Sequence, residues 1–198
     1  MTEAHWFGPK SAKSKGKGHP IMYGKPKPAL HFGDFPDGGG YPKGFIEWAF
    51  SIMGVKDPED VVHLCSGSIK TGITVDIRPE LNPDIVADCR NTGIASNSIH
   101  FILADPPYAQ DYAENLYGTG SVYPKPGEIL KEASRILVDG GLVGIMHFIV
   151  PMTRKPLKML GVWGITTGAG YAIRAWSLFR KDTYAQAEIE KEKEGIKE

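Results

Sequence analysis

The stretch Phe101-Ile102-Leu103-Ala104-Asp105-Pro106-Pro107-Tyr108 decides the fold of this chain. Its first four residues are apolar and predict a buried strand. The two prolines end that strand, because proline has no backbone N–H to donate to a neighbouring strand. Asp105 therefore stands at the carboxyl end of a strand, which is where open α/β sheets bind their ligands.

Other apolar runs of strand length lie on both sides of this one along the chain. The predicted strands cover Val61–Cys65, Ile73–Ile77, Ile85–Ala87, His100–Ala104 and Leu142–Val150. A largely buried helix is predicted from Pro42 to Gly54, and an amphipathic helix from Gly127 to Val138. Proline suits the first residues of a helix and glycine the position after its end, so Pro42, Gly54 and Asp139-Gly140-Gly141 mark the expected limits.

The chain closes with two further strands, Val162–Thr166 and Tyr171–Arg180. The segment Thr167-Gly168-Ala169-Gly170 between them is a hairpin signal. Together with the alternating strands and helices, this predicts an α/β fold with a Rossmann-like sheet, mostly parallel, and a C-terminal antiparallel hairpin.

One connection is too short for this kind of sheet. Only Ser66 to Gly72 separates the first strand from the second, whereas a crossover between parallel strands usually takes a dozen or more residues and a helix. We expect the first crossover helix to be missing, with a tight extended loop containing Ser68, Lys70 and Thr71 in its place.

The two ends of the chain differ in composition from its middle. Residues 1–30 are poor in apolar side chains, and residues 1–28 carry six lysines against one acid, Glu3. This extension is either a solvated leader or an arm that neutralises nucleic-acid phosphates, and the two interpretations are compatible. Residues 31–181 form the predicted domain, and 182–198 a polar tail.

Composition excludes several classes of protein. No apolar run reaches membrane-spanning length, and the N-terminus has no apolar segment typical of a secretory signal. Cys65 and Cys89 are too few for a disulfide framework and lack the spacing of zinc ligands. The sequence therefore predicts a reduced, cytoplasmic setting and no bound metal.

Four short polar features follow the predicted strands, each at a carboxyl end. They are Cys65-Ser66-Gly67-Ser68, Asp76-Ile77, Asp88-Cys89 and Asp105-Pro106-Pro107-Tyr108. Each feature alone is weak evidence. Their order and their common position at strand ends predict one ligand site along one edge of the sheet.

These features resemble the class I S-adenosylmethionine-dependent methyltransferases, in particular the amino-methyltransferases with a D-P-P-Y motif. The resemblance spans roughly residues 41–181 and implies S-adenosylmethionine as the cofactor. It places Asp76 at the ribose hydroxyls and Asp88 beside the adenine ring. The residues that it implies for cofactor binding are Tyr41, Pro42, Lys43, Cys65, Ser66, Gly67, Ser68, Asp76, Ile77, Asp88 and Cys89.

The resemblance assigns catalysis to Asp105, Pro106, Pro107 and Tyr108. Asp105 and the main-chain carbonyl of Pro106 accept the two hydrogens of an exocyclic amine, and this directs its lone pair toward the methyl group. Tyr108 can stack on the base. An aspartate with an ordinary pKa of about 3.9 is a poor base for a neutral amine. We therefore expect Asp105 to orient the amine and stabilise charge.

The sequence is compatible with three functions. The first is methylation of DNA, at adenine N6 ahead of cytosine N4, on a base flipped out of the helix. The second is methylation of an RNA base, and the third is an idle methyltransferase-like subunit that binds nucleic acid. The family's DNA enzymes carry a target-recognition insert, and here only the Ala109–Pro126 loop and the N-terminal extension are available. Three explanations stay open: sequence selectivity is low, a partner subunit or a homodimer supplies target recognition, or the substrate is smaller than DNA.

Two sets of side chains near the site stay ambiguous. His147 is expected at the site edge but is left out of the catalytic set, because a lone histidine is more often structural. The tyrosines Tyr108, Tyr112, Tyr117 and Tyr123 suit stacking on an extruded base, and an ordinary surface loop explains them equally well.

Overall fold

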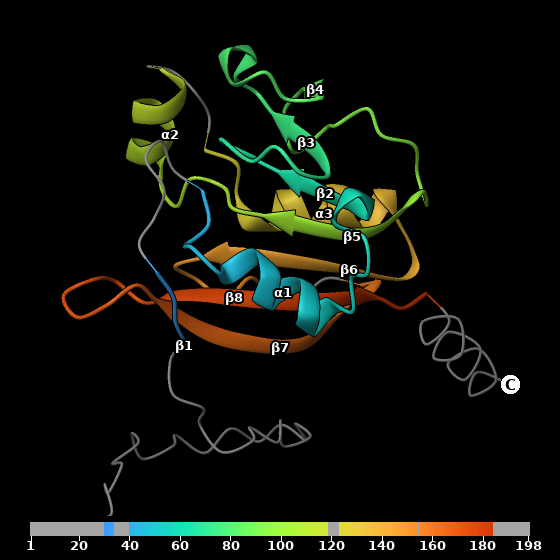
Figure 1. Cartoon of the computed structure of the whole chain (residues 1–198). Coiled ribbons are helices and arrows are strands. Elements are labelled where there is room, and N and C mark those ends of the chain that lie inside the picture. Colours follow the sequence, from blue (N-terminus) through green and yellow to red (C-terminus); the bar gives the residue numbers. More distant parts are fainter. Residues whose placement is uncertain (1–29, 34–39, 119–122, 154, 184–198) are drawn as a thin grey trace, which may run out of the picture.

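One sheet of eight strands organises the residues that the computed structural model describes, namely 30–33, 40–118, 123–153 and 155–183 (Figure 1). Its strand order is β1-β7-β8-β6-β5-β2-β3-β4. The strands are β1 (Leu30–His31), β2 (Val61–Leu64), β3 (Ile73–Asp76), β4 (Ile85–Val86), β5 (Ile99–Ala104), β6 (Leu137–His147), β7 (Leu157–Thr166) and β8 (Arg174–Lys181). The helices are α1 (Phe45–Met53), α2 (Gln110–Tyr117) and α3 (Pro126–Ile136), with 3-10 turns at Pro58–Asp60 and Pro79–Leu81.

Strand directions follow the prediction. Strands β4, β3, β2, β5 and β6 pair in parallel, and β8 runs antiparallel between β6 and β7. Strand β1 pairs in parallel with the end of β7, through Leu30 and Ile165. The predicted α/β class, the mostly parallel sheet and the C-terminal antiparallel hairpin are therefore confirmed.

The central strands bury side chains on both of their faces. Val62, Ile102 and Val143 point toward α3, behind the sheet in Figure 1. Val61 and Leu103 point the other way, toward α1 in front. This alternation with period two explains why these strands read as unbroken apolar runs in the sequence.

Helix α1 lies on a cluster of aromatic rings. Phe45 contacts Tyr41 at 5.1 Å between ring centroids and Trp176 at 5.7 Å. Trp48 reaches Trp176 at 5.1 Å. Gly54 adopts a φ of 74° and its N–H caps the carbonyl of Phe50, so the helix ends where the sequence places its end.

The structure has few helices for a sheet of this kind. The helix between β2 and β3 is missing, as predicted: residues 65–72 form turns and bends. The described residues between β6 and β7, 148–153 and 155–156, contain no helix either, which the sequence analysis did not foresee. The register places Leu157 opposite Lys181 and His147 opposite Ala175, so this short connection returns along the length of the sheet in extended form.

Some predicted bounds are wrong. Helix α3 ends at Ile136, and Asp139-Gly140-Gly141 lies inside β6, because Ile99 already pairs with Leu137. The expected loop Ala109–Pro126 contains helix α2. Residues 1–29 and 184–198, which include nearly all of the predicted extension and tail, lie outside the described residues, and Leu30 is already a strand residue.

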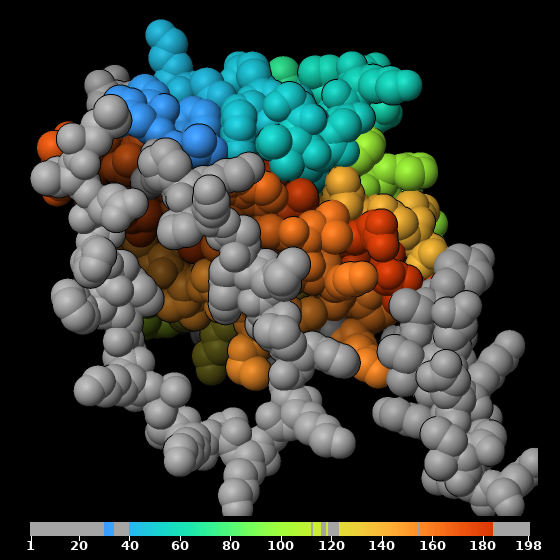
Figure 2. All heavy atoms as spheres, turned by 90° about the horizontal axis from the view of Figure 1, so that it is seen from below, coloured from blue at the N-terminus to red at the C-terminus, as the bar shows by residue number. Residues whose placement is uncertain are grey.

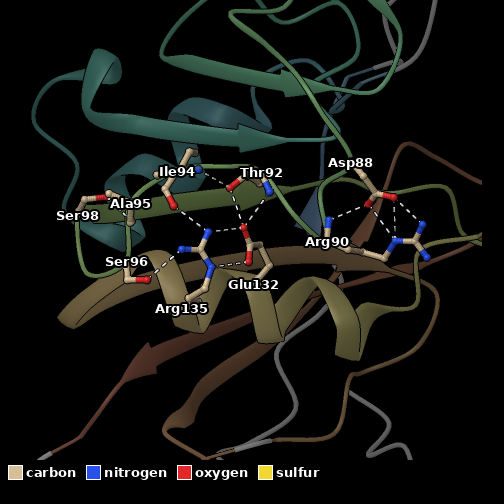
Figure 3. Close-up of polar contacts among 9 residues, drawn as sticks. All are labelled: Asp88, Arg90, Thr92, Ile94, Ala95, Ser96, Ser98, Glu132 and Arg135. Carbon is tan, nitrogen blue, oxygen red and sulfur yellow. Dashed lines mark hydrogen bonds and ion pairs between the residues drawn. The ribbon is translucent and has the colours of Figure 1, made fainter.

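Helix α3 is tied to the chain that connects β4 with β5 by a buried carboxylate (Figure 3). Oε1 of Glu132 accepts hydrogen bonds from the Thr92 N–H at 2.9 Å and the Thr92 hydroxyl at 2.8 Å. Arg135 donates to both carboxylate oxygens, at 2.7 and 2.8 Å, and also to the Ile94 carbonyl. This clamp holds the segment that follows Asp88.

None of the described helices is both long enough and apolar enough to cross a membrane.

We predict that Glu132→Ala destabilises the protein by about 2–4 kcal/mol, because it leaves the buried Thr92 donors and Arg135 without their acceptor. The measurement is urea unfolding followed by circular dichroism. Lys131→Ala, at the neighbouring exposed position on α3, is the control and should change stability by less than about 0.5 kcal/mol. Equal stability of the two variants would contradict the role of the clamp.

Candidate functional site

The predicted site residues gather at the carboxyl ends of the parallel strands. The ends of β2, β3, β4 and β5 reach the same edge of the sheet, and α2 lies beyond that edge, on the left in Figure 1. Leu64 pairs with both Val75 and Ala104, so the turns after β2, β3 and β5 leave the sheet side by side.

The turn after β2 is narrow and strained. Cys65 and Gly67 both have positive φ angles, 56° and 57°. Such angles cost a cysteine energy and a glycine very little. Ser66 donates its N–H to the carbonyl of Val75 at 3.0 Å, and Gly67 donates to Asp76 Oδ2 at 2.9 Å. Ser66 and Gly67 are buried, and Ser68 is exposed.

Asp76 is buried, and its carboxylate already accepts hydrogen bonds from other residues of the protein. Oδ1 accepts hydrogen bonds from the backbone N–H of Arg78 at 3.0 Å and from its Nε at 3.1 Å. Oδ2 accepts from Gly67 and, at 3.4 Å, from the Arg78 guanidinium. Ribose hydroxyls would therefore have to replace Arg78 on this carboxylate. Ile77, the next residue, is exposed and free to contact a ligand.

Asp88 repeats this arrangement after β4 (Figure 3). Its carboxylate accepts hydrogen bonds from the Arg90 backbone N–H at 2.8 Å and from the Arg90 guanidinium at 2.5 Å. The hydrogen bonds from Arg90 hold the pKa of Asp88 below its usual value. Both acids of the predicted adenosine site are thus paired with the arginine two residues further along the chain.

Cys89, which follows Asp88, contacts Cys65 in the turn after β2. A hydrogen bond with Cys89, together with burial, raises the pKa of the Cys65 thiol well above its ordinary value. Neither cysteine forms a disulfide, and the raised pKa keeps the Cys65 thiol protonated at neutral pH. Cys89 is buried and Cys65 is half-buried, so both pack as small side chains.

The catalytic motif after β5 has a different electrostatic setting. The Tyr108 hydroxyl donates to Asp105 Oδ1 at 2.6 Å. Burial raises the pKa of Asp105 to about 7, although the Tyr108 hydrogen bond and Arg174 both act to lower it. The expectation of an ordinary aspartate pKa is therefore wrong: near neutral pH this carboxyl group can take up a proton as well as accept hydrogen bonds. Pro106 and Pro107 are buried beneath it.

The ring of Tyr108 is held by its neighbours. The Arg174 guanidinium carbon lies 5.4 Å from the Tyr108 ring centroid, and the Phe148 ring lies 4.6 Å away. A base that stacks on Tyr108 would have to displace one of these two side chains. Arg174 comes from the start of β8, far from the motif in sequence, and its charge favours the ionised form of Asp105.

His147, at the carboxyl end of β6, orients a tyrosine. Its Nδ1 accepts a hydrogen bond from the Ile149 N–H at 3.1 Å, and its Nε2 lies 2.7 Å from the Tyr123 hydroxyl oxygen. Burial lowers the pKa of His147 to about 4, so the ring is neutral at pH 7. The proton then resides on Nε2 and is donated to Tyr123, which leaves the Tyr123 hydroxyl proton for another acceptor.

The segment before α1 also reaches the site. Burial and the neighbouring Asp105 raise the pKa of Tyr41 well above its ordinary value, so its hydroxyl stays protonated. Pro42 is buried, and its carbonyl accepts a hydrogen bond from the Phe45 N–H at 2.9 Å. Lys43 is exposed.

Two hydroxyls in the site fit a bound polar ligand. Tyr41 Oη and Ser66 Oγ are buried and have no hydrogen-bond partner among the described residues. Buried polar groups in proteins are almost always paired, so an unpaired hydroxyl beside Asp105 and another in the turn after β2 suit a ligand with its own donors and acceptors. The ion pairs on Asp76 and Asp88 are the part of the site that must rearrange for S-adenosylmethionine to bind.

The structure brings the Asp105 motif, the turn after β2, Asp76 and Tyr41 to one edge of the sheet, and three further residues lie around Tyr108. Arg174, Phe148 and His147 surround Tyr108; of these, the sequence pattern predicts only His147 near the site, and not in the catalytic set. Only the pairing of β8 with β6 brings Arg174 here, and no local pattern signals it. The side chains of Tyr112 and Tyr117 lie outside the described residues.

Comparison with known proteins identifies the fold. No protein-family model matches this sequence, and no curated protein matches it. Among solved structures, the Escherichia coli protein yhhF, described as a methyltransferase, superposes with a TM-score of 0.50 at 10% identity over 78% of this chain and 98% of that chain. TrmN from Thermus thermophilus gives a TM-score of 0.48 at 14% identity, over 68% of this chain and 47% of that chain.

The match over most of both chains agrees with the strand order and directions. The chain has the Rossmann-like fold of class I methyltransferases. At this level of identity the likeness establishes the fold alone, and this chain spans less than half the length of TrmN.

We predict that Asp105→Asn stabilises the protein above neutral pH. A carboxyl group whose pKa rises on folding from about 3.9 to about 7 opposes folding once it is ionised. The gain in melting temperature should be absent near pH 4, grow as pH rises to about 7, and stay constant above that. Thermal melts across this pH range measure it, with Asp60→Asn at the opposite edge of the sheet as the control. A gain that does not change with pH would contradict the raised pKa.

Proposed function

We propose that this chain is an S-adenosylmethionine-dependent methyltransferase that acts on an exocyclic amine of a nucleic-acid base, with adenine N6 in DNA as the first candidate. The proposal rests above all on Asp105: a carboxyl group with a raised pKa, at the end of β5, hydrogen-bonded to Tyr108, in a class I methyltransferase fold.

The cofactor, when bound, supplies an electrophilic methyl group. Along the edge of the sheet, Asp76 would hold the ribose, Asp88 would lie beside the adenine ring, and the hydroxyls of Tyr41 and Ser66 would pair with polar groups of the cofactor. Because Gly67 has no side chain, the backbone of this turn could approach the cofactor closely. Around the position that a Cβ would take, the nearest atom is the tip of the Arg78 side chain, at 4.0 Å.

The substrate amine would lie against Asp105. In its ionised form this carboxylate, with the carbonyl of Pro106, accepts the two amine hydrogens and turns the nitrogen lone pair toward the methyl group. Because the pKa of Asp105 is about 7, the same group can also receive the proton that the amine loses on methylation. Tyr108 keeps the carboxylate oriented through its hydrogen bond.

Neighbouring side chains suit a planar, polar substrate. A base would stack on Tyr108 once Arg174 or Phe148 moves aside, and Tyr123, oriented by His147, would offer its hydroxyl proton to an acceptor on the base ring. An RNA base would use the same contacts and is the alternative substrate.

One observation favours a second function, an idle methyltransferase-like subunit that binds nucleic acid. Arg78 and Arg90 occupy the two acids that would hold the cofactor. If these ion pairs do not open, the chain cannot bind S-adenosylmethionine. Cofactor binding therefore separates the two functions directly.

We predict that the wild type binds S-adenosylmethionine and that Asp76→Ala weakens binding by about ten- to a hundredfold, because charge-assisted hydrogen bonds to the ribose are lost. Isothermal titration calorimetry measures it. Asp60→Ala, in the exposed turn before β2, is the control. An inert wild type would point to the idle subunit, whereas unchanged affinity of Asp76→Ala would contradict only the role of that residue.

We predict that Asp105→Ala abolishes methyl transfer and leaves cofactor affinity within about twofold, because the contact to the amine matters in the transition state. Incubation with labelled cofactor and either DNA or RNA, followed by digestion and identification of the modified base, measures transfer and names the substrate. Glu59→Gln, at the opposite edge of the sheet, is the matched control.

The wild-type rate should also rise with pH and level off above about 7, since ionised Asp105 is the active form. Loss of cofactor binding together with activity in Asp105→Ala would mean that this residue is structural. A rate that falls as pH rises through 7 would mean that its protonated form is the one required.

A further inference from the structure

Arg174 begins β8 and reaches across to the Tyr108 ring. Its guanidinium carbon lies over that ring, 5.4 Å from the ring centroid, and 5.7 Å from the centroid of the Phe148 ring. The hydroxyl of the same tyrosine donates to Asp105 at 2.6 Å. A cation therefore covers the aromatic ring that a target base would need for stacking.

The backbone of Arg174 is held in the sheet. Arg174 pairs with Ile165 of β7, and Ile165 pairs in turn with Leu30 of β1. The next residue, Ala175, pairs with His147 at the end of β6. This end of the hairpin lies at the left of Figure 1, and β7 forms the orange middle of the face seen in Figure 2. A movement away from the Tyr108 ring therefore involves the side chain of Arg174 and not its backbone.

A base that stacks on Tyr108 has to displace either Phe148 or Arg174. The Phe148 ring lies 4.6 Å from the Tyr108 ring, and moving it outward would expose more apolar surface to water. The contact between a guanidinium and a partly exposed ring is weak, and a charged group is readily hydrated when it leaves. Displacement of Arg174 therefore costs less free energy.

The displaced guanidinium would keep a partner. Extruded bases stack on aromatic rings and also on the planar guanidinium of arginine. A base over Tyr108 would meet the Arg174 guanidinium on its other face once that group has moved outward by roughly 3.5 Å, the thickness of one stacked ring. Rotation about the bonds of the long arginine side chain allows such a shift. The contact that Arg174 loses on Tyr108 is thus replaced by one on the base.

We propose that Arg174 stacks on the target base, which inserts between the Tyr108 ring and the Arg174 guanidinium. This inference rests on the proposed function for the identity of the site, and it adds how the base is held there. It applies to a base of DNA or of RNA, because both present the same aromatic faces. The edge of the base then points toward Asp105, since Tyr108 is hydrogen-bonded to that carboxyl group.

The charge of Arg174 has a separate effect on Asp105. The ionisable groups that face Asp105 are Tyr41, Cys65, Tyr108 and Arg174, and the pKa values of the first three are raised, so they are neutral at pH 7. Burial raises the pKa of Asp105, and the charge of Arg174 acts against it. Lysine keeps this charge but has no planar group that stacks. A lysine at this position therefore separates stacking from charge.

The test uses the full chain, the variants Arg174→Lys and Arg174→Ala, and the control Arg180→Ala. The control removes an arginine from the other end of β8, opposite Leu142. Binding is measured by fluorescence anisotropy with labelled single-stranded DNA and RNA of mixed sequence, and with abasic strands of the same length. Abasic strands keep the phosphates and lack the stacking partner. Melting temperatures verify that each variant folds.

Wild type and control should bind strands with bases more tightly than abasic strands. On strands with bases, Arg174→Ala should weaken binding about tenfold and Arg174→Lys about fivefold. On abasic strands Arg174→Ala should match the control and Arg174→Lys the wild type. In transfer from labelled cofactor, Arg174→Lys should raise KM about fivefold and keep the pH midpoint of the rate, whereas Arg174→Ala should move that midpoint upward.

Four outcomes would overturn stacking by Arg174. Tighter binding by Arg174→Ala would mean that Arg174 only covers the ring, and equal losses on abasic strands would mean that it contacts a phosphate. Wild-type binding and KM in Arg174→Lys would mean that its charge alone matters. Equal binding of both kinds of strand by the wild type would mean that no base enters.

Absence of methyl transfer by the wild type to any DNA or RNA would defeat the proposed function instead. The comparison of strands with and without bases would still decide the role of Arg174.

Discussion

The parallel pairing of β2 with β5 is the constraint on which the core and the candidate site both depend. The pairs run from Val61 with Phe101 to Leu64 with Ala104. Because the strands end in register, the strained Cys65 turn and the Asp105 motif leave the sheet next to each other, and one face of each strand packs on α3 while the other packs on α1. A shift by one residue would exchange the two faces and move Asp105 away from the turn after β2.

Three carboxylates at this edge have different chemistry because their neighbours differ. Asp76 and Asp88 each face an arginine two residues further along, which offers a short and local counter-charge. Asp105 is followed by two prolines and a tyrosine, so its side chain pairs with a neutral hydroxyl, and the cation that acts on it, Arg174, arrives from β8. Burial raises the pKa of Asp105, whereas the hydrogen bonds from Arg90 lower that of Asp88. Environments that push the pKa values of similar groups apart are typical of sites that separate binding from proton transfer.

The scarcity of helices has a consequence for the surface. The described residues of the β2–β3 and β6–β7 connections contain no helix, so the sheet receives less cover than a helix on each crossover would provide. Aromatic packing around Trp176 and the Glu132 clamp stabilise the domain instead. The β6–β7 connection also leaves apolar side chains exposed, among them Phe148 beside Tyr108.

The sequence by itself determined seven of the eight strands, the antiparallel hairpin, the missing first crossover helix and the edge of the sheet to which the turns with Cys65, Asp76, Asp88 and Asp105 belong. Each of these follows from local information: apolar runs, prolines and glycines at fixed places, and loops too short for a helix. Only the tertiary structure decided that Arg174 and Phe148 surround Tyr108, that His147 orients Tyr123, and that Asp105 has a pKa near 7. Burial and contacts between residues distant in sequence depend on how strands pair and pack, and no window of sequence contains that information.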